Sequence, residues 1–144
     1  MLTRRHILEL IPHQGSMCLL DEVMSWTNTT ITCWSQSHLS PANPLRRNGE
    51  LHAVCGIEYG LQAAAVHGAL VANRAQPPGY LAALRSVEIM VPRLDDAGYG
   101  RLQVTAELEL RQSSGLIYGF ALHSIAGAPL LSGRATILLP EIPS

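Results

Sequence analysis

Two side chains in this sequence combine acid–base chemistry with apolar surroundings, His13 and Glu58. His13 follows Pro12 in a turn-rich segment, and Glu58 is the only acid between Glu50 and Glu88. Histidine titrates near neutral pH and is the commonest general base, whereas a desolvated glutamate can keep its proton near pH 7 and act as an acid. Each also has an ordinary role, His13 as a hydrogen-bonding loop residue and Glu58 as a paired buried carboxylate.

Glu58 lies in the most apolar stretch of the chain, residues 51–74, which read LHAVCGIEYGLQAAAVHGALVANR. The stretch is long enough for about six helical turns, and Asn48-Gly49 and Pro77-Pro78-Gly79 bound it. A helix that is apolar on all sides is buried. We therefore expect this helix to form the core of the fold, with Gln62 one turn after Glu58 on the same face.

Small residues recur every fourth position along the predicted helix: Gly56, Gly60, Ala64 and Gly68. Each glycine costs roughly 1 kcal/mol in a helix interior relative to alanine, so another element must approach this stripe closely. A membrane span also needs about 20 apolar residues. Residues 53–72 have nearly this length, but they contain Glu58, Gln62 and His67 and have no aromatic belt. We therefore expect a sheet around a buried helix and no membrane insertion.

The rest of the chain carries mainly strand patterns. Residues 18–24 and 29–37 flank Thr27-Asn28 and predict a β-hairpin, and the strict alternation of residues 101–112 predicts a half-buried strand. Further strands are expected over 80–91, 116–125 and 129–139, and a short helix from Thr3, its N-cap, to Leu10. The order predicts one α+β domain over residues 1–144. Its long central helix would be wrapped by a curved antiparallel sheet and closed by a second subunit, which is a dimeric hotdog fold.

Composition narrows the function classes. The chain is 47% hydrophobic with a net charge of −1, which argues against nucleic-acid binding and suggests a subunit interface. All ten basic residues are arginine, and the pairs Arg4-Arg5 and Arg46-Arg47 are either solvated or grip phosphate or an acidic carrier. Cys18, Cys33 and Cys55 show no metal or disulfide spacing, so we expect reduced core thiols in a cytoplasmic protein.

Two motifs in the chain resemble the (3R)-hydroxyacyl-acyl-carrier-protein dehydratases of the FabZ type. Residues 12–21, PHQGSMCLLD, keep that family's spacing of eight residues between the histidine and the aspartate. Residues 56–68, GIEYGLQAAAVHG, resemble its helix motif of an acid followed four residues later by glutamine. Together with residues 81–96, LAALRSVEIMVPRLDD, they are more similar to the ApeP-like hotdog dehydratases of aryl polyene gene clusters. The resemblance covers nearly the whole chain.

The resemblance implies dehydration of a 3-hydroxyacyl thioester to a trans-2-enoyl thioester. The substrate would be carried on the phosphopantetheine of acyl carrier protein, with no further cofactor and no metal. His13 would remove the α-proton, and Glu58, contributed by the partner subunit, would protonate the departing hydroxyl. The residues expected to bind substrate are Gly15, the N–H groups of Ala53 and Val54 at the helix start, and Gln62, which either contacts the substrate or orients Glu58.

Two other functions fit the same residues. A hotdog thioesterase would use the helix carboxylate to activate water. A non-catalytic acyl-binding or scaffold subunit would pair with another dehydratase in a hetero-complex, instead of forming a homodimer or higher oligomer. Ala53 stands where the family usually has glycine, and this departure keeps the second alternative open. His67 is expected to be a hydrogen-bonded core or interface residue, and Arg85 and Arg93 either dock the carrier or lie on a solvated, salt-bridged face.

Overall fold

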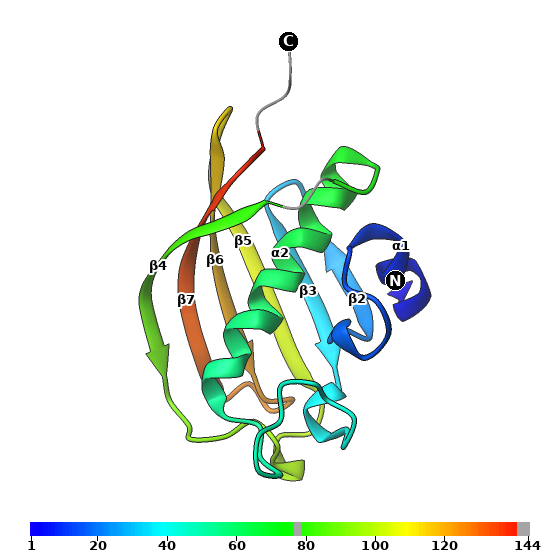
Figure 1. The fold of residues 1–144 in the computed structure, drawn as a ribbon, viewed down its shortest axis with the longest axis vertical. Helices are drawn as coiled ribbons and strands as arrows, with labels where there is room; N and C mark the ends of the chain where they lie inside the picture. Colours follow the sequence, from blue (N-terminus) through cyan, green and yellow to red (C-terminus); the bar gives the residue numbers. More distant parts are fainter. Residues whose placement is uncertain (77–78, 141–144) are drawn as a thin grey trace.

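The computed structural model describes residues 1–76 and 79–140 and consists of a seven-stranded sheet with a long helix on its concave side (Figure 1). The strands are all antiparallel, in the order β1-β2-β3-β5-β6-β7-β4. Their bounds are β1 Leu2–Thr3, β2 Glu22–Trp26, β3 Thr30–Ser35, β4 Tyr80–Ile89, β5 Leu102–Gln112, β6 Gly115–His123 and β7 Pro129–Leu138. The helices are α1 (Arg4–Leu10) and α2 (Gly56–Ala72). This arrangement confirms the predicted α+β hotdog fold; Pro77 and Pro78 of the predicted helix boundary lie outside the described residues.

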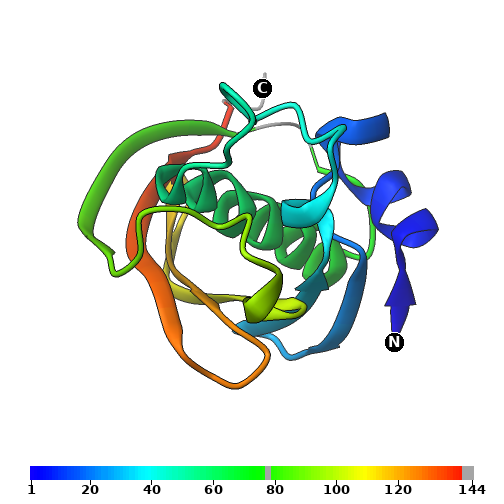
Figure 2. The same ribbon diagram turned by 90° about the horizontal axis from the view of Figure 1, so that it is seen from below.

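The sheet curves around α2 and packs on its small residues (Figure 2). A Cβ on Gly60 would lie 2.5 Å from the Phe120 ring of β6, and one on Gly56 would lie 3.1 Å from Leu122. The predicted close approach of a sheet is confirmed at these two glycines. At Gly68 the nearest atom would be the Tyr118 hydroxyl at 3.9 Å, so the end of the stripe is less tightly packed.

The central helix is shorter than predicted. It is preceded by a 3₁₀ turn, Ala53–Cys55, and ends at Asn73, which adopts the left-handed conformation with φ of 57°. Before the turn, His52 is extended. The Leu51 carbonyl accepts the Leu94 N–H at 2.8 Å, and the Ala53 N–H donates to the Pro92 carbonyl at 3.2 Å. These contacts with residues 92–94 delay the helix start.

The structure differs from the sequence prediction at the start of β2 and along the second half of β5. β2 begins at Glu22 and not at residue 18, because residues 18–21 are held mainly by side chains, as described below. β5 matches its prediction, but the alternation ends early: Leu102, Val104 and Ala106 are buried, whereas Leu110 is 45% exposed. The second half of β5 therefore extends beyond the packed core. The short pairing of β1 with β2 carried no sequence signal.

One side of α2 is not covered within the protomer. Val54, Glu58, Leu61 and Ala65, spaced along one helical face, are exposed or half-buried; we call them the open face. Within the protomer the sheet therefore leaves one side of the helix open, and this is the side that the predicted second subunit would close. By length and composition Ala53–Ala72 could cross a membrane, but its other sides pack against the sheet, as in a core helix.

The strand β4 forms an exposed edge of the sheet. It pairs only with β7, and the pairing is interrupted by irregularities after Leu81 and after Arg85. Ser86, in the second irregularity, has a φ of 53°. Large apolar side chains remain exposed along this edge and just beyond it: Tyr80, Leu81, Leu84, Ile89 and Met90.

Candidate active site

His13 and Glu58 meet within one chain. The His13 Nε2 atom lies 3.3 Å from Glu58 Oε1, and the two side chains are 28% and 36% exposed. The resemblance implied that the partner subunit contributes Glu58. The structure instead brings both groups together in one protomer, because the segment after α1 runs alongside α2. Glu58 is also more solvated than expected, since it lies on the open face.

The segment that carries His13 has little regular structure. It contains a 3₁₀ turn over Gly15–Met17, and Gly15 adopts a φ of 58°, a conformation that favours glycine. Gln14 ties the start of the segment to α1 through a hydrogen bond from Nε2 to the Leu8 carbonyl at 2.8 Å. His13 Nδ1 is buried and has no hydrogen-bond partner among residues 1–76 and 79–140. The ring is therefore not fixed by a bond from its second nitrogen.

Gln62 lies behind the pair and fastens the segment to the helix. Its Nε2 donates to the Met17 carbonyl at 2.8 Å, and its Oε1 accepts the Leu19 N–H at 2.9 Å. A longer contact of 3.4 Å joins Nε2 to Glu58 Oε1. Because the side chain is buried and its amide is occupied by the backbone, its main contacts are structural, and it approaches Glu58 only weakly.

The start of the helix offers one of the two expected N–H donors. The Ala53 N–H is already bonded to Pro92, so the expectation of a free donor at Ala53 is not met. The Val54 N–H has no acceptor in the described part of the chain. Val54 precedes Glu58 by four residues and so lies on the same face. Glu58 itself is in the first turn of α2, where the helix dipole favours negative charge.

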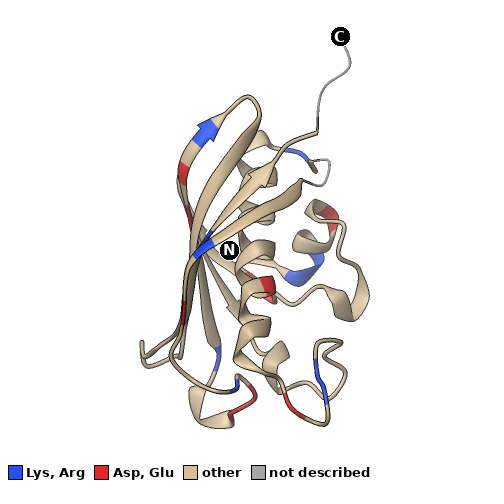
Figure 3. Cartoon of the chain, turned by 60° about the vertical axis from the view of Figure 1, so that its left-hand side comes forward, with Lys and Arg blue, Asp and Glu red and all other residues tan. Residues whose placement is uncertain are grey.

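Charged residues are sparse on α2, whereas a cluster of them lies outside the helix, around Arg93. Figure 3 shows the helix without basic residues, and Glu58 is its single charged position. Arg93 binds Asp95 at 2.6 Å and Glu50 at 3.2 Å, and its guanidinium holds the pKa of Asp95 below its usual range. Arg93 therefore lies in a salt-bridged cluster, as one of the two interpretations expected.

The other titratable core groups have structural roles. His67 is buried between the Tyr118 hydroxyl and the Thr27 carbonyl, at 2.7 Å and 2.9 Å, as predicted for a core residue. The three thiols are free, and burial raises the pKa of Cys33 to about 12. In the described residues, no group of three or more His, Cys, Asp or Glu side chains could hold a metal.

A groove of about 580 Å³ adjoins the same segment but is not the candidate site. It is lined by Ser16 and Cys18 together with Trp34 and Arg101, and neither His13 nor Glu58 contributes to it. The pair of His13 and Glu58 instead lies, partly exposed, at the open face of α2. The sequence singled out Arg4 only as half of the Arg4-Arg5 pair. Its side chain binds this segment from the opposite side, a contact that no spacing in the sequence indicates.

Comparisons with known proteins agree with this architecture. The family model described as ApeP-like, ApeP dehydratase, matches residues 5–143. No curated protein matches the chain. Among solved structures, the dehydratase heterocomplex ApeI:P from Xenorhabdus doucetiae has a TM-score of 0.79 and 21% identity, covering 94% of this chain and 91% of that chain.

More distant structures share the fold. A hypothetical thioesterase with coenzyme A from Streptococcus pneumoniae has a TM-score of 0.61 and 12% identity, covering 84% of this chain and 88% of that chain. The PaaI protein from the phenylacetic acid degradation operon of E. coli has a TM-score of 0.60 and 12% identity, covering 81% of each chain. At such identities the likeness concerns the fold alone.

Proposed function

The chain belongs to the ApeP-like dehydratase family, and from this premise we propose that it dehydrates a 3-hydroxyacyl thioester carried by acyl carrier protein, in aryl polyene or similar biosynthesis. The observation that carries the proposal is the 3.3 Å contact between His13 Nε2 and Glu58 Oε1 on the open face of α2. An imidazole beside a carboxyl group supplies the base and the acid that removal of water requires.

His13 removes the proton from Cα of the substrate. The electron pair forms the Cα–Cβ double bond as the Cβ–O bond breaks, and Glu58 protonates the leaving hydroxyl to give water. Because the two groups are in contact, the proton on His13 can return to Glu58 and restore the pair. Since both groups face the substrate from one side, the proton and the hydroxyl leave from the same face of the acyl chain.

Negative charge develops on the thioester oxygen during this reaction. A preorganised N–H donor stabilises such charge, and we assign this role to Val54 N–H. Gly15 and Gln62 shape the site from behind. No cofactor beyond the phosphopantetheine of the carrier is required by this scheme, and the free thiols are compatible with the cytoplasmic location that we propose.

We also propose that a second hotdog subunit covers the open face. Support comes from the exposed apolar side chains of β4 and from its unpaired edge. The partner would be a second copy, giving a homodimer or higher oligomer, or a different dehydratase subunit, as the name of the heterocomplex describes for that protein. Covering Glu58 would exclude water from the site, which strengthens the electrostatic interactions inside it.

The test follows enoyl formation from a 3-hydroxyacyl carrier-protein substrate, with the chain alone and co-purified with a second dehydratase subunit. We expect His13→Ala and Glu58→Gln each to lower turnover by roughly 10²–10⁴-fold. Glu107→Gln, at an exposed position of β5, is the matched control and should retain wild-type turnover. Near-wild-type turnover in both site variants would overturn the assignment.

The same assay separates the alternatives. Release of free thiol without enoyl product indicates a thioesterase. A stable hetero-complex, in which substitutions of His13 and Glu58 change nothing and the second subunit supplies all turnover, indicates a scaffold role. Either outcome contradicts the proposed dehydration by this chain.

A further inference from the structure

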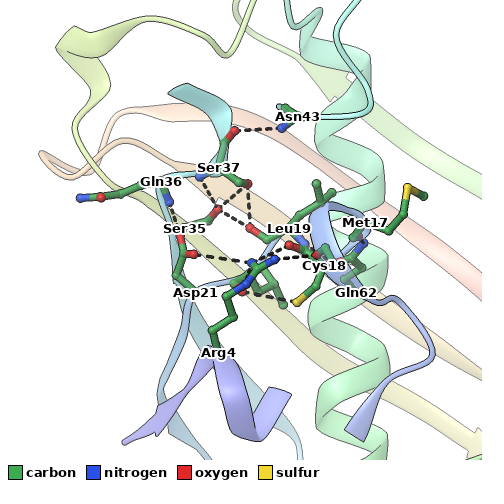
Figure 4. Close-up of polar contacts among 12 residues, drawn as sticks. Arg4, Met17, Cys18, Leu19, Asp21, Ser35, Gln36, Ser37, Asn43 and Gln62 are labelled. Carbon is green, nitrogen blue, oxygen red and sulfur yellow. Dashed lines mark hydrogen bonds and ion pairs between the residues drawn. The ribbon is translucent and has the colours of Figure 1, made fainter. Parts of the chain in front are cut away.

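The backbone of residues 15–20, which follows His13, is held by side chains from several elements (Figure 4). Its carbonyl groups would otherwise be costly to bury without partners. Ser35 and Ser37 both donate to the Leu19 carbonyl, at 2.6 Å and 2.7 Å. Gln62 of α2 binds the Met17 carbonyl and the Leu19 N–H from the helix side. The segment is thus anchored at several points without a neighbouring strand.

Arg4, the first residue of α1, binds the same segment through three carbonyls. Its Nη2 donates to Gly15 at 2.6 Å, and its Nη1 donates to Cys18 at 2.7 Å and to Leu20 at 3.4 Å. Its Nη1 also lies 3.7 Å from Asp21, whose other oxygen accepts the Gln36 N–H at 2.6 Å. These contacts engage both terminal nitrogens of the guanidinium with groups of this chain.

We propose that Arg4 is a positioning residue for the reaction: it acts with Gln62 to hold the His13 segment at the distance from α2 that keeps His13 against Glu58. The inference rests on the proposed function. Arg4 does not contact His13, so its action passes through the backbone. The forked guanidinium reaches the Gly15 and Cys18 carbonyls at once, a geometry that the single ammonium of lysine does not reproduce.

The environment of His13 explains why such anchoring matters. Its Nδ1 has no partner among the described residues, and its Nε2 contacts only the half-exposed Glu58. The position of the ring therefore depends on the backbone that carries it. Because a misplacement of about 1 Å in a catalytic group can cost on the order of 100-fold in rate, a loosened segment should impair turnover before it unfolds the protein.

The experiment compares Arg4→Gln and Arg4→Lys with Arg5→Gln, a matched loss of charge at the exposed neighbouring position. In the active assembly, we expect Arg4→Gln to lower kcat by on the order of 100-fold and Arg4→Lys by on the order of 10-fold, with KM little changed. Arg5→Gln should match wild type. Thermal unfolding measured in parallel separates loss of turnover from loss of the fold. If Arg4→Gln does not fold, the comparison of Arg4→Lys with Arg5→Gln tests the proposal.

A double substitution tests whether Arg4 acts through His13. If it does, adding Arg4→Gln to His13→Ala leaves the residual turnover unchanged, since the group being positioned is already absent. If the two losses multiply, or if Arg4→Gln turns over like Arg5→Gln, the positioning role is wrong although the dehydratase function stands.

A readout independent of turnover separates this inference from the proposed function. We expect the His13 ring resonances in nuclear magnetic resonance spectra to shift in Arg4→Gln and to stay in place in Arg5→Gln. If they shift while wild type forms no enoyl product, Arg4 positions His13 but the proposed function fails. If they stay in place, the inference is overturned.

Discussion

Two histidines, His67 on α2 and His13 beside it, differ in burial and in hydrogen-bond partners. His67, on the sheet side, is fully buried, and both ring nitrogens have partners, Tyr118 Oη and the Thr27 carbonyl. His13, on the opposite side, is 28% exposed, contacts Glu58, and has an unpartnered Nδ1 in the described residues. A satisfied, buried imidazole contributes to packing. A half-exposed imidazole beside a carboxyl group is arranged for proton transfer.

The packing around the two histidines also differs, being tight on the sheet side near His67 and open near His13. The sheet side has glycines that Phe120 and Leu122 approach closely, and such packing tolerates little change. The open face has no covering element in the described part of the protomer. Substitutions on the sheet side should therefore change stability, whereas substitutions beside Glu58 should change turnover. The predictions below test this division.

The largest effect on stability is expected at Gly60. An added Cβ would lie 2.5 Å from Cδ2 and 2.8 Å from Cβ of Phe120, so rotation of the ring cannot relieve the clash. Overpacking costs about 1–3 kcal/mol, which exceeds the gain of roughly 1 kcal/mol in helix propensity. We expect Gly60→Ala to lower the free energy of unfolding by about 1–2 kcal/mol, measured by urea denaturation.

Gly68→Ala is the matched control on the same stripe. Its nearest neighbour would be the Tyr118 hydroxyl at 3.9 Å, an ordinary contact. The helix-propensity term should then dominate and stabilise the protein by up to about 1 kcal/mol. Equal changes in the free energy of unfolding at Gly60 and Gly68 would contradict tighter packing of the sheet on Gly60 than on Gly68.

A comparable effect is expected for Tyr118→Phe. The substitution removes the hydroxyl and leaves His67 Nδ1 buried without its partner, which costs about 1–3 kcal/mol. We expect a lower free energy of unfolding and an unchanged kcat in protein that remains folded, whereas His13→Ala should show the reverse. A loss of kcat in folded Tyr118→Phe would show that the two sides of the helix are coupled.

The smallest effect concerns pH. Burial lowers the pKa of His67 from its ordinary value of 6.5, although the hydrogen bond to the Thr27 carbonyl opposes this shift. The unfolded chain therefore binds a proton at His67 at a higher pH than the folded chain does. The stability contributed by neutral His67 is full above pH 6.5 and is lost as pH falls from that value towards the lowered pKa.

Urea denaturation at about pH 7 and about pH 5 checks the direction of this pH dependence. We expect wild type to lose more stability on acidification than His67→Gln does. An equal loss in both proteins would indicate that His67 titrates alike in the folded and unfolded states.

Much of this fold could be predicted because its signals are local. The alternation of residues 101–112 and the recurrence of small residues from Gly56 to Gly68 report directly which faces are buried. The motifs around His13 and Glu58 likewise identified the two groups that the structure brings together. Their meeting within one chain could not be predicted, because spacing in the sequence does not distinguish a neighbour from a partner subunit.

The remaining features depend on contacts between distant segments. The late start of α2 follows from Leu51 and Ala53 binding residues 92–94, which no local pattern encodes. The role of Arg4 depends on the turn at Gly15 that directs two carbonyls towards one guanidinium. The exposure of Glu58 depends on which side of the helix the sheet leaves open, and the amphipathic pattern is too weak to indicate that side.

The exposed edge of β4 affects the solubility of the isolated chain. An unpaired edge with large apolar side chains is a template for adding strands from unfolded or identical chains, which leads to aggregation. The irregularity at Ser86 interrupts that edge and limits the length over which such chains can stack. A protomer made without the proposed second subunit should therefore precipitate as its concentration rises, and synthesis together with that subunit should raise the yield of dissolved protein.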